Sequence, residues 1–253
     1  MSIGYRGIDT ARSYANEEYI GEGIAEALKR KILKRGELFV TSKLKATDAH
    51  NYYSAKEAID KSLLRCRLDY FDLFLLHMPF GDYFSAWQTL EDALIEGKIR
   101  NIGVSNFFRG QLVNFIECVH IRPAVDQIEI NPEKNQRTML RILNYYNILP
   151  MAYSPLGGKD STIYDNEVIA EIAKKHGKTP AQVVLRWHIQ RGTPVIAKTS
   201  NYKRMIENLQ VYDYNLDAQE MELIEDLNKQ RDTYDSHLAP DYVRARLGRE
   251  LII

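Results

Sequence analysis

Four polar residues with the chemistry of a proton-transfer site follow short apolar runs in the first third of the chain. They are Asp9 and Tyr14 in GYRGIDTARSYANE, Lys43 in LFVTSKL, and His77 in FDLFLLHMP. A buried lysine beside an aspartate stays charged, and its charge favours proton release from a neighbouring phenol. Asp, Tyr and Lys together therefore indicate a general acid, against which a neutral histidine can position a carbonyl oxygen.

Each of these residues also has a structural explanation when it is considered alone. A single histidine before Met78 and Pro79 is more often hydrogen-bonded within a fold than catalytic, and Asp9 could cap the following turn. The catalytic interpretation therefore depends on the fold bringing all four side chains to one end of one sheet.

The elements that must position these residues alternate between short apolar strands and amphipathic helices. Seven strands are expected, near residues 5–8, 38–41, 71–76, 99–104, 124–128, 149–152 and 194–197. Thr179 and Pro180 predict the start of a further helix, and another is expected over residues 216–227. The alternation indicates a parallel sheet built from βαβ units. Polar residues at many strand ends, without a GxGxxG turn, favour a (β/α)8 TIM-barrel type over an open doubly wound sheet.

Composition limits which classes of partner and which cellular location are expected for the protein. A chain of 253 residues with 45% hydrophobic content can form one domain over residues 1–253. Its 34 basic and 34 acidic residues cancel, which argues against nucleic acid or an anionic membrane as a partner. Two cysteines and the lack of a signal-like start favour the cytoplasm, and no apolar run reaches the about 20 residues that span a bilayer. Small molecules are the expected partners.

Seven ordered motifs resemble those of the aldo-keto reductase family. Besides the three segments above, they are IRNIGVSNF, DQIEINP, AYSPLGG and VIAKTSNYKRMIEN. The resemblance implies reduction of an aldehyde or ketone to an alcohol, with the hydride supplied by NADPH and without a metal. It assigns Tyr14 as the general acid and His77 as the group that orients the carbonyl. Lys43 and Asp9 are assigned as the pair that favours proton release from Tyr14.

The same resemblance implies residues that contact the nicotinamide and the pyrophosphate of the cofactor. Positions that bond the nicotinamide amide are matched by Ser105, Asn106 and Gln127, and Tyr153 matches the ring that stacks on the nicotinamide. The loop at the pyrophosphate is matched by Ser154, Leu156 and Gly157. A purely structural turn at Gly157 is an alternative, and both interpretations can hold.

A second group of residues is implied for the adenosine end. An anion site at a helix N-terminus is matched by Lys198, Thr199, Ser200 and Arg204, and positions facing the adenine are matched by Glu207 and Asn208. Two cations at this point suit a 2′-phosphate and so favour NADPH over NADH. Taken without the family, Lys198 and Arg204 could be solvated surface charges.

The family has a strand and a helix ahead of GYRGIDTA, and this first βα unit, on the order of 30 residues, is expected to be missing. A shortened sequence of an active ancestor, completion by a partner chain, and loss of activity are three explanations. The first is favoured because all four catalytic positions are intact. The chain is then expected to bind NADPH weakly and to have little reductase activity by itself. A monomer is usual in the family and exposed strand edges favour association, so a monomer or a weak homo-oligomer is expected.

Other functions and the substrate class stay open from the sequence. A non-catalytic nucleotide-binding protein, like the potassium-channel accessory subunits of this fold, is one alternative to the reductase. A barrel hydrolase is another, but the histidines lack the spacing of metal ligands. Short segments after His77 and at residues 232–253 resemble bacterial members that reduce sugar-derived or small dicarbonyl compounds.

Overall fold

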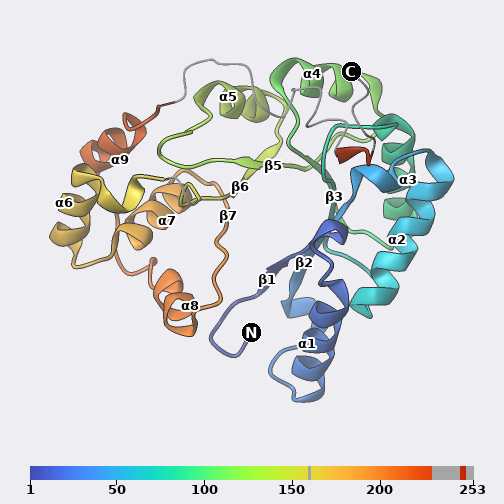
Figure 1. Cartoon of the computed structure of the whole chain (residues 1–253), viewed down its shortest axis with the longest axis horizontal. Helices are drawn as coiled ribbons and strands as arrows, with labels where there is room; N and C mark the ends of the chain where they lie inside the picture. The colour runs from blue at the N-terminus through green and yellow to red at the C-terminus, as the bar shows by residue number, and fades with distance from the viewer. Residues whose placement is uncertain (159–160, 230–245, 249–253) are drawn as a thin grey trace. The chain divides into compact units, whose positions relative to one another are not determined.

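The computed structural model describes residues 1–158, 161–229 and 246–248. The chain divides into two compact units (Figure 1), of which the first comprises residues 1–126 with the described residues 246–248, and the second residues 127–229. No helix in these described ranges is long and apolar enough to cross a membrane. The single domain expected from composition stays a prediction.

The first unit is built from four strands in chain order, each followed by a helix. The strands are β1 (Gly7–Asp9), β2 (Phe39–Leu44), β3 (Leu73–Leu76) and β4 (Ile102–Ser105). The helices are α1 (Glu17–Lys29), α2 (Tyr52–Cys66), α3 (Tyr83–Ile95) and α4 (Arg109–Cys118), with short 3₁₀ turns η1 (Arg12–Tyr14), η2 (Arg35–Glu37) and η3 (Ala46–Asp48). Neighbouring strands pair in parallel, and α1, α2 and α3 lie along one side of β1, β2 and β3 (Figure 1).

A buried ion pair ties the first helix to the second strand and the second helix. Glu17 is 2% exposed, pairs with Arg65 at 2.7 Å, and accepts hydrogen bonds from the hydroxyls of Ser42 and Ser62. A buried carboxylate needs such partners because its desolvation costs several kcal/mol, about as much as the pairing returns. The network therefore fixes how α1 packs, and with it the segment that carries Tyr14.

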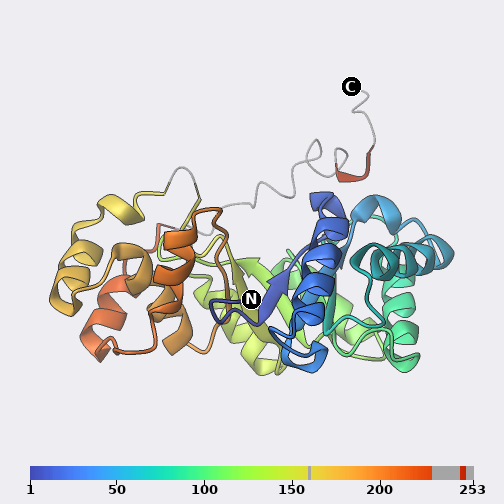
Figure 2. The same cartoon turned by 90° about the horizontal axis from the view of Figure 1, so that it is seen from below.

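The second unit contains the remaining strands and five helices among its described residues. The strands are β5 (Val125–Glu129), which begins at the last residues of the first unit, β6 (Leu149–Tyr153) and β7 (Val195–Ile196). The helices are α5 (Arg137–Tyr145), α6 (Glu167–His176), α7 (Pro180–Gln190), α8 (Tyr202–Leu209) and α9 (Ala218–Glu225), with a 3₁₀ turn η4 (Ile163–Asp165). Strands β6 and β7 are parallel, and Figure 2 gives a second view of the helices.

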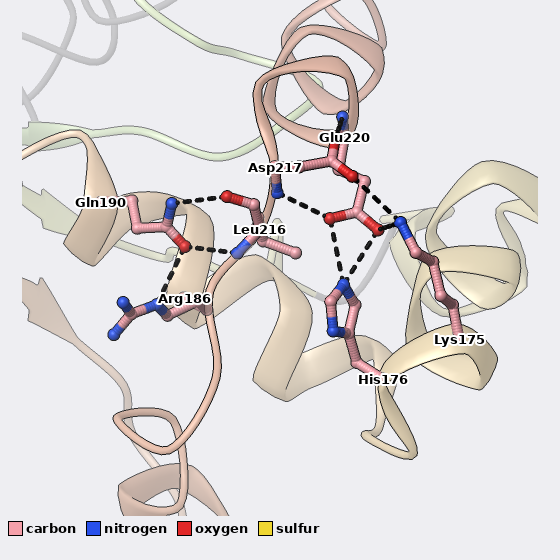
Figure 3. Close-up of polar contacts among 7 residues, drawn as sticks. All are labelled: Lys175, His176, Arg186, Gln190, Leu216, Asp217 and Glu220. Atoms are coloured by element: carbon pink, nitrogen blue, oxygen red, sulfur yellow. Dashed lines mark hydrogen bonds and ion pairs between the residues drawn. The ribbon is translucent and has the colours of Figure 1, made fainter.

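Polar contacts hold α9 and the segment before it against α6 and α7 (Figure 3). Glu220 accepts from His176 Nε2 at 2.9 Å and pairs with Lys175 at 2.7 Å. Gln190 both donates to the carbonyl of Leu216, at 2.9 Å, and accepts from its amide, at 2.7 Å. These contacts attach α9 and the segment before it to α6 and α7 within the second unit.

The predicted strands correspond to the seven strands of the structure, with small differences at their ends. Lys43 lies within β2, which continues to Leu44, whereas the sequence placed it just after the strand. Thr179 caps α7 as predicted, with its side chain accepting from the amide of Gln182. Helix α9 is shorter than the expected segment 216–227 because Asp217 caps it and Leu216 is held by Gln190. Of the tail at 232–253, only residues 246–248 lie within the described ranges.

Candidate active site

Strand register places Asp9, Lys43 and His77 on the same face of the first unit's sheet. Asp9 is opposite Thr41 in β2, and Lys43, two residues later, points to the same side because side chains alternate along a strand. Lys43 is in turn opposite Leu75 in β3, and His77 follows two residues later. From β1 to β2 and from β2 to β3, the polar residue therefore lies two residues beyond the one paired with its neighbour. Asp9, Lys43 and His77 thus lie on one face of the sheet.

Lys43 is the centre of the group. Its side chain is fully buried, and its ammonium forms an ion pair with Asp9 Oδ1 and donates to the carbonyl oxygen of Thr10 at 3.1 Å. The same nitrogen lies 3.4 Å from the hydroxyl of Tyr14 and 5.0 Å from the centre of its ring. The aspartate and the carbonyl replace the water that burial removes from this ammonium.

Tyr14 ends η1 and presents its hydroxyl to Lys43 while half of its surface remains open. The residue is 50% exposed, and the left-handed backbone of Ala15, with φ of 53°, turns the chain from η1 toward α1. Its ring meets the ring of His77 edge to face, with centroids 5.7 Å apart and planes at 87°. A buried cation and an accessible phenol are thus joined at one point, which is the arrangement that proton donation to a small molecule requires.

His77 is held in the neutral form. Burial, together with the positive charges of Lys43 and Arg246, lowers the pKa of its imidazole to about 3. Its amide donates to the carbonyl of Leu44 at 3.1 Å, which fixes its backbone beside the end of β2. Its Nδ1 lies 3.2 Å from the hydroxyl of Ser13, a contact that the sequence motifs did not single out.

Ser105 and Asn106 follow at the end of β4 and are tied to the same group. The side-chain amide of Asn106 donates to the carbonyl of His77 at 3.1 Å and to the hydroxyl of Ser105 at 3.0 Å. Asn106 has a left-handed backbone with φ of 62°, a conformation that asparagine tolerates better than most residues. Gly103, earlier in β4, allows Val125 to approach the strand closely, because a side chain there would meet the carbonyl of Val125 at 2.6 Å.

The second unit carries the other residues that the sequence assigned to a cofactor. Gln127 is buried in β5, where its amide lies 3.2 Å from Met151 Sδ, and Tyr153 ends β6 with its carbonyl accepting from the amide of Ile130. The amide of Gly157 donates to the carbonyl of Ser154 at 2.9 Å, which forms a turn after β6. Both residues have left-handed backbones, with φ of 77° and 46°, a conformation that glycine adopts readily.

A buried histidine, which the sequence analysis did not single out, holds this turn. His188 in α7 is fully buried, and its Nε2 lies 3.3 Å from the carbonyl of Pro155. Leu156 follows directly in the chain, so helix α7 anchors the loop at its centre. The only sequence signal is a histidine on the buried face of α7, and that pattern is equally typical of a core residue.

Around α8 the structure modifies the expected anion site. The backbone amides of Lys203 and Arg204 both donate to Asn201 Oδ1, at 2.9 and 3.2 Å, and the amide of Asn201 donates to the hydroxyl of Thr199. The side chain of Asn201 thus satisfies these backbone amides at the start of α8. The side chains of Lys198, Ser200 and Arg204 are exposed, and neither cation has an acidic partner among the ion pairs of the described residues.

Glu207 and Asn208 lie in the last turn of α8 and are half-buried. The carboxylate of Glu207 accepts from the hydroxyl of Thr179 at 2.7 Å, which links α8 to the start of α7. The structure therefore brings together the four catalytic candidates, Ser105 and Asn106 in the first unit. It places the other predicted residues on β5, β6, the loop after β6 and the segment around α8 in the second.

Comparison with known proteins gives a consistent result. The model of the aldo/keto reductase family matches residues 1–229. A glyoxal reductase of Bacillus subtilis is 42% identical over 227 residues, 89% of this chain and 80% of the relative. A methylglyoxal reductase of Yersinia pestis is 39% identical over 224 residues, 87% of this chain and 78% of the relative. The crystal structure of a Bombyx mori aldo-keto reductase in complex with NADP superposes with a TM-score of 0.87 at 36% identity, covering 95% of this chain and 85% of that one.

These matches confirm the predicted fold class, an incomplete (β/α)8 TIM-barrel type in which the described residues supply seven strands. The polar residues at the ends of β1 to β4 occupy the end of the strands at which barrels of this type bind their substrates. The chain belongs to the aldo-keto reductase family, whose members are oxidoreductases that reduce carbonyl groups with NADPH.

Proposed function

We propose that this protein reduces a small aldehyde or ketone to an alcohol, with Tyr14 as the general acid. The observation that carries the proposal is the position of the Lys43 ammonium, paired with Asp9 and 3.4 Å from the Tyr14 hydroxyl. When Tyr14 gives its proton to the carbonyl oxygen, the phenolate that remains is stabilised by the buried cation. Asp9 holds the ammonium in place through their ion pair.

His77 has a different role from Tyr14 in this proposal. Because its pKa lies at about 3, the imidazole carries no extra proton at pH 7 and can give the carbonyl only a hydrogen bond. That hydrogen bond orients the oxygen toward Tyr14 and leaves Tyr14 as the proton source. Two neighbouring groups with well separated proton affinities thus divide orientation and proton transfer between them.

The residues of the chain fit NADPH. In the first unit, Ser105 and Asn106 are the residues that we propose to contact the carboxamide of the nicotinamide. In the second unit we propose Gln127 for the same group and the turn after Tyr153, with its left-handed backbones, for phosphate. The exposed side chains of Lys198 and Arg204 can bind a 2′-phosphate, with Thr199 and Ser200 beside them. Bound NADPH supplies the hydride. The remaining proposed contacts are those of Tyr153 with the nicotinamide, of Ser154, Leu156 and Gly157 with the pyrophosphate, and of Glu207 and Asn208 with the adenine.

For the substrate, we propose a sugar-derived or small dicarbonyl compound. The glyoxal and methylglyoxal reductases among the relatives support a dicarbonyl substrate, because each is named for a small dicarbonyl compound. A cytoplasmic, single-domain protein, either a monomer or a weak homo-oligomer, is the form we propose for this activity.

Comparing the wild type with Tyr14→Phe tests the proposal. NADPH oxidation with glyoxal, methylglyoxal and a panel of aldoses is followed by absorbance, and NADPH binding is measured by calorimetry. Loss of the acid should lower kcat by about 10²- to 10⁴-fold while the Kd for NADPH stays unchanged. Equal turnover in both proteins would refute the assignment of Tyr14. Binding without turnover in either would identify an inactive nucleotide-binding member of the family.

A further inference from the structure

Ser13 lies directly before Tyr14 in η1 and contacts the side chain of His77. The distance from its hydroxyl oxygen to His77 Nδ1 is 3.2 Å, and the two residues are 64 positions apart in the sequence. Both belong to the first unit, and the Tyr14 ring meets the same imidazole edge to face. One 3₁₀ turn therefore presents the acid and, beside it, a hydroxyl for the orienting histidine.

The contact matters because a neutral imidazole has two different nitrogens. One carries the proton and donates, and the other has a lone pair and accepts. His77 is neutral since burial and the cations Lys43 and Arg246 keep its pKa low. Neither cation can accept a hydrogen bond, so neither of them favours a proton on Nδ1. The hydroxyl of Ser13 can donate to Nδ1, and in that case the proton of the ring is on Nε2.

We infer that Ser13 is a positioning residue that fixes His77 in the tautomer with the proton on Nε2, so that the nitrogen not engaged by Ser13 donates to the carbonyl oxygen of the substrate. The inference rests on the proposed function and adds a residue to it. In the opposite arrangement Ser13 would accept from Nδ1–H, and a lone pair on Nε2 would repel the lone pairs of the carbonyl. Orientation of the substrate by His77 therefore requires Ser13 to be the donor.

The tautomer can be observed without substrate or turnover. Protein labelled with ¹⁵N-histidine is examined by long-range ¹H–¹⁵N correlation at pH 7, and the His77 signals are assigned from their absence in His77→Gln. We expect a protonated Nε2 and a bare Nδ1 in the wild type. A proton on Nδ1 would overturn the inference even if the enzyme proves active, and the spectrum stays decisive even if no carbonyl substrate is turned over.

Three substitutions at Ser13 connect the tautomer with catalysis. In Ser13→Asp the new carboxylate can only accept, so the proton should move to Nδ1, and kcat should fall by about 10²-fold, as for a lost donor to a developing oxyanion. In Ser13→Ala the ring loses its partner, and kcat should fall about 2- to 10-fold. Ser13→Thr keeps the hydroxyl and should retain both the wild-type tautomer and kcat.

The KM for NADPH should be the same in all four proteins, because Ser13 acts on the carbonyl through His77. A wild-type kcat in Ser13→Asp with its proton on Nδ1 would refute the link between tautomer and rate. A loss in Ser13→Thr as large as that in Ser13→Ala would show that packing, and not the hydroxyl, is what matters.

Discussion

His188, the buried histidine that contacts the loop after β6, should make the free energy of unfolding depend on pH. Burial lowers the pKa of His188 to about 3, although the hydrogen bond with Pro155 opposes the shift, and the charge of Arg191 adds to it. Its Nδ1 has no hydrogen-bond partner in the described part of the chain. The folded protein therefore keeps this imidazole neutral far below the pH at which an unfolded chain would protonate it.

The size and sign of the effect follow from this difference in pKa. Between pH 6.5 and pH 3 the unfolded state binds a proton that the folded state does not, so stability is lost as the pH falls through this window. From an unfolded pKa of about 6.5 and a folded value of about 3, the free energy of unfolding should drop by about 2 kcal/mol between pH 7 and pH 5. His188→Gln keeps a donor for Pro155 but cannot bind the proton, and it should lack this loss.

Urea unfolding of both proteins at pH 7, 6 and 5, followed by tryptophan fluorescence and circular dichroism, measures the effect. The stability of the variant relative to the wild type should rise by about 2 kcal/mol from pH 7 to pH 5. Gln190→Leu is the matched control, since it removes the contacts with Leu216 from the same helix without removing a titrating group (Figure 3). A constant difference between His188→Gln and the wild type would refute the reasoning, and a drift in the control would invalidate the measurement.

Three further predictions follow from other contacts. Lys43→Met removes the cation beside the phenol, and kcat should fall about 10²- to 10⁴-fold with NADPH binding retained, as measured by single-turnover kinetics and fluorescence titration. Arg204→Ala should raise the Kd for NADPH by about 10- to 100-fold, since a hydrogen bond to a charged group is lost, whereas the Kd for NADH should not change. Glu17→Ala leaves the Arg65 charge without its buried partner and should cost about 3–5 kcal/mol in urea unfolding. The exposed ion pair removed by Glu22→Ala should cost at most about 1 kcal/mol, and similar losses in the two variants would contradict the assigned burial.

Much of the fold could be predicted from local patterns. Apolar runs gave all seven strands, and Thr179 with Pro180 gave the start of α7, because capping and periodicity depend on residues a few positions apart. The ends of elements were less accurate. Helix α9 begins at Ala218 because Asp217 caps it, and Lys43 lies within β2 because pairing with β3 extends that strand to Leu44.

The sequence proposed the members of the candidate site but not the contacts that they make. The motifs named Lys198 and Arg204, yet only the structure shows that Asn201 already satisfies the amides at the start of α8. The phosphate binding that we propose there therefore relies on side chains more than the sequence suggested. His188 was missed because a buried histidine on an apolar helix face gives no local signal of its partner, and Pro155 is 33 residues away.

The sequence by itself determined which chemical groups are available and that they follow the ends of strands. Parallel strands present those ends at one edge, so Asp9, Lys43 and His77 could be assigned to one site from their order alone. Tertiary structure decided which groups they contact. The register of β1, β2 and β3 puts the Lys43 ammonium against both Asp9 and Tyr14, and burial keeps His77 neutral. The hydroxyl of Ser13 reaches an imidazole 64 residues away, because contact distance and desolvation depend on packing between segments that are remote in the chain.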